Sequence, residues 1–179
     1  MPVLKDGKNA PAASLSMTLF TEGREQELRL ELRDGRRSSV INGVEKKTGS
    51  ALVGKFCAVI FSPEHLLLVK EGPSRRRAFL DGALCQSRPA FTRVLAHYNK
   101  ALMQRNALLK DIPRHPELID TLDVWDERLI LFGTEVVQER AAFCKDLEPR
   151  AAEIYRGIAK NREEITLLTR RLAVRRQKR

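Results

Sequence analysis

The chain has 179 residues, of which 42% are apolar and 31% charged, a balance that supports a folded core and excludes wholesale disorder. Its formal net charge of +10 favours phosphate-bearing or acidic partners, although residues 156–179 alone carry +7 of that charge. The three cysteines are widely spaced and no Cys/His cluster accompanies them, which argues against a disulfide framework and a zinc site.

The first part of the chain is predicted to form β-structure. Residues 1–14 lack periodicity and read as a disordered leader. Strands are predicted at 15–20, 27–32 and 38–41, and the second alternates leucine with charged residues, as a half-buried strand does. Asp34-Gly35 is a favourable hairpin turn, because both residues tolerate positive φ, and Asn42-Gly43 closes the return strand. A short helix is expected at 50–54, and the apolar run 56–61 indicates a strand buried on both faces.

Helices are predicted from Pro73 onward. The apolar spacing favours helices over 75–85, 89–110 and about 116–147, with Gly133 as a weak point in the third, and a fourth beginning at Glu148-Pro149. Residues 165–168 are a further strand candidate. The predicted fold class is therefore α+β. Its segments are a leader (1–14), a β-rich part (15–72), a helical part (73–164) and a basic tail (165–179).

A search for catalytic motifs yields no catalytic residue and no metal ligand. The steps Gly7-Lys8 and Gly54-Lys55 lack the following Ser or Thr and the upstream glycine of a phosphate-binding P-loop. Residues 78–81 are the nearest approach to a Walker B strand, but they lie in a helical context. The three histidines are isolated in the sequence. No apolar run approaches membrane-span length and no signal-peptide pattern precedes the fold, so we expect a cytoplasmic protein without membrane contact.

Arg75, Arg76 and Arg77 form a run of cations where a helix is predicted to begin. Successive helical positions point about 100° apart, so we expect one or two of them to face solvent or phosphate and one to pair with Asp81 or Glu64. Cations oppose the dipole at a helix N-terminus, which favours a binding role. The alternative is a solvated charge run with one structural ion pair.

The residues around this run resemble the RecF family of bacterial DNA replication and repair proteins. Its characteristic segment is matched by Pro63-Glu64, Leu68-Val69, Gly72-Pro73, Arg76-Arg77 and Phe79-Leu80-Asp81, while Glu71 stands where the family has glycine. Further similarity, in the same order along the chain, lies at Asn42-Gly43, Val59–Ser62, Tyr98–Lys110, Trp125–Glu127 and Arg140–Phe143. The resemblance extends from about Met17 to Glu164.

The resemblance implies a part of an ABC-type ATPase head related to SMC proteins. Residues 15–72 would form a partial lobe I, and residues 73–164 a mainly helical lobe II. Intact family members bind ATP with Mg²⁺, bind single- and double-stranded DNA, dimerise around the nucleotide, and act with RecO and RecR in recombinational gap repair and the SOS response. The family's Walker A loop, signature loop and Walker B strand are not found here, so the chain resembles the middle of such a protein. We expect no ATPase activity and no cofactor for this chain alone.

The same resemblance assigns roles to individual residues. Ser62, Pro63 and Glu64 take the place of the Q-loop, the joint that senses γ-phosphate, and Gly72 and Pro73 would set a hinge. The candidates for DNA or phosphate binding are Lys70, Arg75, Arg76 and Arg77, and Asp81 is the candidate for a structural ion pair. Two alternatives remain open: a stand-alone basic nucleic-acid-binding module, and a helical partner-docking protein that touches no nucleic acid.

Overall fold

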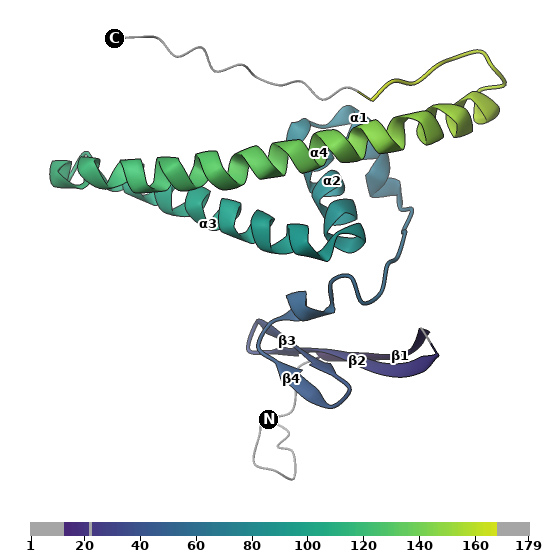
Figure 1. The fold of residues 1–179 in the computed structure, drawn as a ribbon, viewed down its shortest axis with the longest axis horizontal. Helices are drawn as coiled ribbons and strands as arrows, with labels where there is room; N and C mark the ends of the chain where they lie inside the picture. Colours follow the sequence, from purple (N-terminus) through teal and green to yellow (C-terminus); the bar gives the residue numbers. More distant parts are fainter. Residues whose placement is uncertain (1–12, 22, 168–179) are drawn as a thin grey trace. The chain divides into compact units, whose positions relative to one another are not determined.

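The computed structural model describes residues 13–21 and 23–167, which belong to two compact units (Figure 1). The unit that ends at Ile60 contains an antiparallel β-sheet, and the unit that begins at Phe61 is helical. This order of elements confirms the α+β class. Among the described residues, no helix combines the length and the apolar character that crossing a bilayer requires.

The sheet consists of four antiparallel strands in sequential order, β1 (Ala13–Thr21), β2 (Arg24–Arg33), β3 (Arg36–Ile41) and β4 (Val44–Lys46). Both predicted turns have the left-handed backbone that they require: φ is 48° and 73° at Asp34-Gly35, and 49° and 79° at Asn42-Gly43. β1 begins at Ala13, so the last two residues of the predicted leader lie in a strand. The rest of that leader falls outside the described residues.

The strand register gathers the leucines of β2 on one face of the sheet. Leu30 lies opposite Leu15 and Ser39, and Leu28, only 3% exposed, lies opposite Met17 and Ile41. A 3₁₀ helix, η1 (Gly49–Leu52), matches the short helix predicted at 50–54. It packs here because Ser39, fully buried, donates a hydrogen bond of 2.8 Å to the carbonyl of Thr48.

The predicted strand at 56–61 is wrong for this chain. These residues are not part of the four-stranded sheet, and the side chains of Val59, Ile60 and Phe61 are 102%, 73% and 82% exposed. An uninterrupted apolar run forms a strand buried on both faces only where neighbouring strands and covering layers exist. The run itself carries no information about whether the chain supplies them.

The second unit begins with a 3₁₀ turn, η2 (Pro63–Leu66), that continues into the single-turn helix α1 (Leu67–Lys70). The helices α2 (Pro73–Ser87) and α3 (Pro89–Asp111) confirm two predicted helices. A second 3₁₀ segment, η3 (Pro116–Thr121), precedes α4 (Leu122–Ile158). Residues 163–167 are not in a strand, and Leu168, the end of the predicted strand, lies outside the described residues.

The third and fourth predicted helices are one continuous helix, α4, so the predicted boundary at Glu148-Pro149 is wrong. Pro149 lies inside α4, where it lacks a backbone donor and its ring crowds the preceding turn, yet the helix continues to Ile158. Gly133 is also helical. A Cβ at this position would lie 3.4 Å from Cε2 of Tyr98, so the glycine allows α3 to approach α4 closely.

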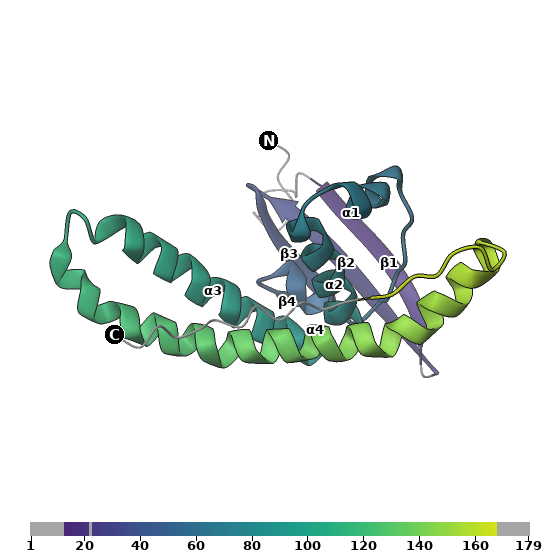
Figure 2. The same ribbon diagram turned by 90° about the horizontal axis from the view of Figure 1, so that it is seen from above.

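The core of the helical unit lies where α2, α3 and α4 meet (Figure 2). Leu84 of α2, Phe91 of α3 and Val136 of α4 form its centre and are at most 3% exposed. Around them pack Cys85, Val94, Leu95, Tyr98 and Phe143. α3 and α4 lie side by side and run antiparallel, because the chain reverses direction between Asp111 and Leu122.

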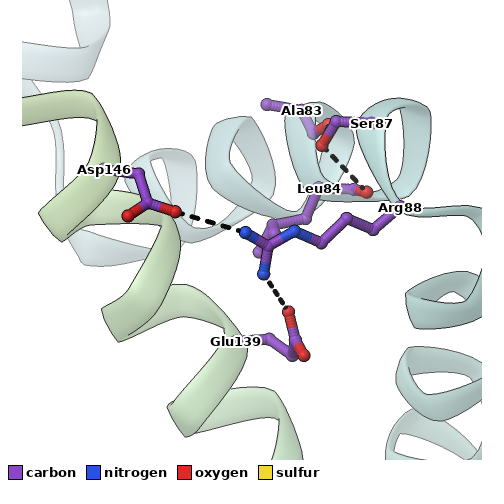
Figure 3. A network of polar contacts seen from close by, with 6 residues as sticks. All are labelled: Ala83, Leu84, Ser87, Arg88, Glu139 and Asp146. Atoms are coloured by element: carbon purple, nitrogen blue, oxygen red, sulfur yellow. Dashed lines mark hydrogen bonds and ion pairs between the residues drawn. The ribbon is translucent and has the colours of Figure 1, made fainter. Parts of the chain in front are cut away.

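A polar network fixes the junction between α2 and α3 against α4 (Figure 3). Arg88, the residue between α2 and α3, donates hydrogen bonds to Glu139 at 2.5 Å and to Asp146 at 3.4 Å. Ser87 caps the end of α2 by donating to the carbonyls of Ala83 and Leu84. The corner between the two helices is thereby tied to α4 at two points.

Candidate functional site

The predicted Q-loop-like residues open the helical unit. The amide of His65 donates to the carbonyl of Ser62 at 2.9 Å, and the amide of Ser62 donates to Nδ1 of His65 at 3.0 Å. Nδ1 of His65 is therefore the acceptor in this bond. Pro63 occupies the first turn of η2, where its missing N–H has no helical partner to lose, and Glu64 is exposed.

The predicted hinge residues have extended, unstrained backbones. Gly72 precedes α2 with φ −69° and ψ 175°, and Glu71 has φ −91° and ψ 174°. Neither residue needs the left-handed conformation that favours glycine, so a glutamate at position 71 fits without strain. Pro73 begins α2, where its fixed φ suits the first helical position.

The arginine run holds the α1–α2 junction together. Arg75 pairs with the carboxylate of Glu71. Arg76 donates to two backbone carbonyls, those of Leu68 at 3.1 Å and of Glu71 at 2.9 Å, and so satisfies acceptors at the end of α1. Arg77 donates to the hydroxyl of Ser74 at 3.2 Å. All three guanidinium groups, like Lys70 at the end of α1, remain exposed.

Asp81 does form a structural ion pair, but the predicted pairing with an arginine of the run is wrong. Its partner is Arg140 of α4, which donates Nε to Oδ1 and Nη2 to Oδ2, each at 2.7 Å. The two side chains are only 17% and 18% exposed. A two-point bond at a half-buried position is stronger than an exposed pair four residues apart on one helix, so Arg140 rather than Arg77 holds the carboxylate.

An aromatic cluster beside the arginine run was not singled out from the sequence. The ring of His65 lies 6.3 Å from the ring of Phe61 and 6.2 Å from that of Phe79, the latter edge-on. Phe79 follows Arg75 by four residues and Arg76 by three, so all three share one side of α2. That spacing is visible in the sequence and could have drawn attention to Phe79.

A groove of about 730 Å³ runs along α3 and α4 outside the predicted site. Its apolar lining includes Leu102, Ile130 and Val137. An ion pair between Arg105 and Asp126 lies at the groove, and the hydrogen bond from the guanidinium raises the pKa of Arg105 above its usual value. Within 13–21 and 23–167, no three His, Cys, Asp or Glu side chains gather in a way that could hold a metal ion.

The sequence is similar to curated DNA replication and repair proteins named RecF. It is 40% identical to that of Agathobacter rectalis over 83% of this chain and 42% of the relative, and 37% identical to that of Lachnoclostridium phytofermentans over 87% and 44%. The protein of Acetivibrio thermocellus is 42% identical over 71% of this chain. The chain thus spans less than half the length of the curated relatives it matches. No family model matches the sequence.

Two solved structures are similar to this fold. One is described as the recombination mediator protein RecF–ATP in the RecFOR pathway, with a TM-score of 0.76 and 29% sequence identity over 82% of this chain and 40% of that one. The other, RecF–ATPrS of the same pathway, has a TM-score of 0.72 and 30% identity over 80% and 38%.

Proposed function

The chain is a RecF-family sequence with the fold of part of an ABC-type ATPase head, and we propose that it supplies DNA contacts to a RecF-like protein in replication-gap repair. The observation that carries this proposal is the exposed run Arg75–Arg77 at the start of α2, next to the exposed Lys70. Exposed guanidinium groups bind phosphate with two parallel hydrogen bonds, so the run suits a nucleic-acid backbone.

The three arginines of the run have different partners and therefore different roles in this proposal. Arg76 already bonds to the carbonyls that end α1, so its main task is to hold the α1–α2 junction. Arg75 and Arg77 have one side-chain partner each, Glu71 and Ser74, and both are exposed. The partner that the structure gives for Arg77 is an uncharged hydroxyl, which offsets the positive charge less than a carboxylate would. Arg77 and Lys70 are therefore the principal phosphate ligands in this proposal.

Nucleotide chemistry belongs, in this proposal, to the rest of a longer RecF-like protein. The neighbours described as RecF–ATP and RecF–ATPrS are more than twice as long as the stretch they share with this chain. The joint Ser62–Glu64 and the hinge Gly72-Pro73 would move the helical lobe when ATP and Mg²⁺ bind to that longer protein, which would dimerise around the nucleotide and work with RecR and RecO. The chain by itself would bind no nucleotide and hydrolyse none.

A salt titration of DNA binding tests the proposal. Affinity of the chain for a labelled duplex, measured by fluorescence anisotropy, should fall with salt with a log–log slope of about −0.9 per phosphate contact. The double variant Arg75→Gln/Arg77→Gln should flatten the slope by about one to two units, and Lys70→Gln by about one unit. Arg76 stays intact, because its loss would disturb the α1–α2 junction.

The matched control is Arg93→Gln, which removes the same charge from an exposed position of α3. An equal effect of this control would show that net charge rather than the run sets the affinity. If only removal of residues 170–179 flattens the slope, the chain acts as a basic module that binds through its tail.

The groove of α3 and α4 favours a second candidate, a protein that docks a partner without nucleic acid. Its apolar residues Leu102, Ile130 and Val137 offer the kind of surface that an amphipathic helix recognises. Absence of any DNA binding at low salt, together with capture of a purified repair protein that Ile130→Asp abolishes, would select this function.

A further inference from the structure

A set of three rings, two exposed and one half-buried, lies beside the arginine run and is not part of the core of this unit. Phe61, His65 and Phe79 form what we call the aromatic patch. The ring centroid of His65 lies 6.3 Å from that of Phe61 and 6.2 Å from that of Phe79. Phe61 is 82% exposed and Phe79 is 47% exposed. The core of this unit is built by Leu84, Phe91 and Val136 instead. Exposed apolar side chains that gather in one patch, rather than lying singly, are typical of a binding surface.

The surface next to Phe79 is open. Gly82 follows Phe79 by three residues on the same side of α2, and a Cβ added at Gly82 would meet no atom within 4 Å. Arg75 and Arg76 precede Phe79 on that side, one turn toward the N-terminus of the helix. A flat ring can therefore reach the face of Phe79 while a charged group attached to it reaches a guanidinium.

The charges around the patch favour an anionic partner. Among residues 13–21 and 23–167, the acceptors of Arg76 and Arg77 are uncharged groups, and Lys70 is exposed, so these three cations can interact with an anionic ligand. Glu71 is paired with Arg75, and Asp81 is paired with Arg140, which leaves Glu64 as the exposed carboxylate among residues 62–81. A protein interface centred on such a patch would have to bury several cations, whereas interface centres are depleted of charged residues.

We propose that the aromatic patch stacks the bases of single-stranded nucleic acid while Lys70 and the arginine run bind the adjoining phosphates. Exposed rings beside a cationic track are the combination by which proteins hold single strands without reading their sequence. Phe79 and Phe61 provide the stacking faces. The amide bond from Ser62 to Nδ1 of His65 fixes the imidazole between them. This inference rests on the proposed DNA-binding function and assigns to it a second, uncharged component.

The test compares two labelled single strands of equal length and charge, an oligothymidylate and an abasic strand that lacks bases. For each base that stacks, the chain is expected to bind the oligothymidylate about 5- to 150-fold more tightly, since each stacked base contributes about 1–3 kcal/mol. Phe79→Ala should remove most of this preference and leave the affinity for the abasic strand within about twofold, whereas Phe79→Trp should retain the preference.

Two further variants distinguish a loss of base stacking from a loss of folding. Phe61→Ala changes a side chain that is 82% exposed, so it should lower the preference without altering the far-ultraviolet circular dichroism. Ile154→Ala, at a residue of α4 that is 65% exposed and lies outside both proposed binding surfaces, should change neither affinity. Equal affinity of the unaltered chain for both strands would overturn base stacking while leaving the phosphate-binding proposal intact. Binding to neither strand would overturn the stacking inference, and the duplex titration would then decide the phosphate-binding proposal. A preference untouched by Phe79→Ala and Phe61→Ala would overturn the aromatic patch as the stacking surface.

Discussion

Arg140 and Asp81, 59 positions apart in the sequence, join α4 to α2 through two parallel hydrogen bonds of 2.7 Å. Both side chains are less than one-fifth exposed, so water screens the pair only in part. Asp81 precedes Leu84, the fully buried centre of the core, by three residues, or about one turn of α2. It therefore fixes which face of α2 meets α4.

Removing one member of this pair should destabilise the fold. Asp81→Asn is expected to lower the free energy of unfolding by about 1–3 kcal/mol, because the guanidinium of Arg140 loses a charged, two-point acceptor in a half-buried place. Urea unfolding followed by circular dichroism measures the change. A double-mutant cycle with Arg140→Gln should give a coupling energy above about 1 kcal/mol. The exposed pair of Glu71 and Arg75 serves as the control and should couple by less than about 0.5 kcal/mol.

Pro149 should make α4 less stable than its length suggests. Pro149→Ala restores a backbone donor in the helix interior and relieves the ring's clash with the preceding turn, which together are worth up to about 3 kcal/mol. The variant should show a higher melting temperature and slower amide exchange after position 145. Pro89→Ala is the matched control: this proline begins α3, where no helical bond is lost, and its replacement should have little effect. A similar gain at both positions would contradict the explanation.

The phenol of Tyr155 should lose its proton at a higher pH than an ordinary tyrosine, because its pKa is raised. It donates a hydrogen bond of 2.5 Å to Glu163, and that bond raises the pKa of Tyr155 above its ordinary value of 10.0. Because the folded state favours the protonated phenol, the stabilisation is present in full below pH 10 and is lost as the pH rises through the folded-state pKa. An absorbance titration of tyrosinate should show a late transition that disappears in Tyr155→Phe and moves to lower pH in Glu163→Gln. An unchanged transition in Glu163→Gln would rule out this bond as the cause.

Mg-ATP should leave the melting temperature of the chain unchanged. A ligand at 100 times its dissociation constant adds about 2.7 kcal/mol to the stability of the state it binds, which would shift the transition by several degrees. Gly54 has the positive φ of 78° seen in turns, but Lys55 is followed by Phe56 rather than by a hydroxyl residue that could bind magnesium water. Differential scanning fluorimetry with and without Mg-ATP measures the shift. A clear rise would contradict the proposal that nucleotide binding needs the longer protein.

The local turns and the two central helices were predictable because their signals are local. Asp34-Gly35 and Asn42-Gly43 predict the left-handed backbone that the hairpin turns adopt. Pro73 and Pro89 stand at the first positions of α2 and α3. The similarity to RecF likewise depends on residues close together in sequence, and curated relatives and solved structures confirm it.

Two of the errors concern information that lies elsewhere in the chain. Residues 56–61 have the composition of a buried strand, but a strand needs neighbours that a short window does not describe. The partner of Asp81 could not be chosen from its own helix, because Arg140 lies on α4. Pro149 usually marks a helix boundary, yet here the helix continues past it to Ile158. The roles of Ser62–Glu64, Gly72-Pro73 and the arginine run remain predictions.

The unequal lengths of α3 and α4 have a consequence for the stability of α4. At 1.5 Å per residue, the 37 residues of α4 span about 55 Å and the 23 residues of α3 about 35 Å, so α4 exceeds its neighbour by some 20 Å. Figure 2 shows that α4 curves along its length and continues past the first turn of α3. The last turns of α4 therefore depend for their stability on contacts other than those with α3.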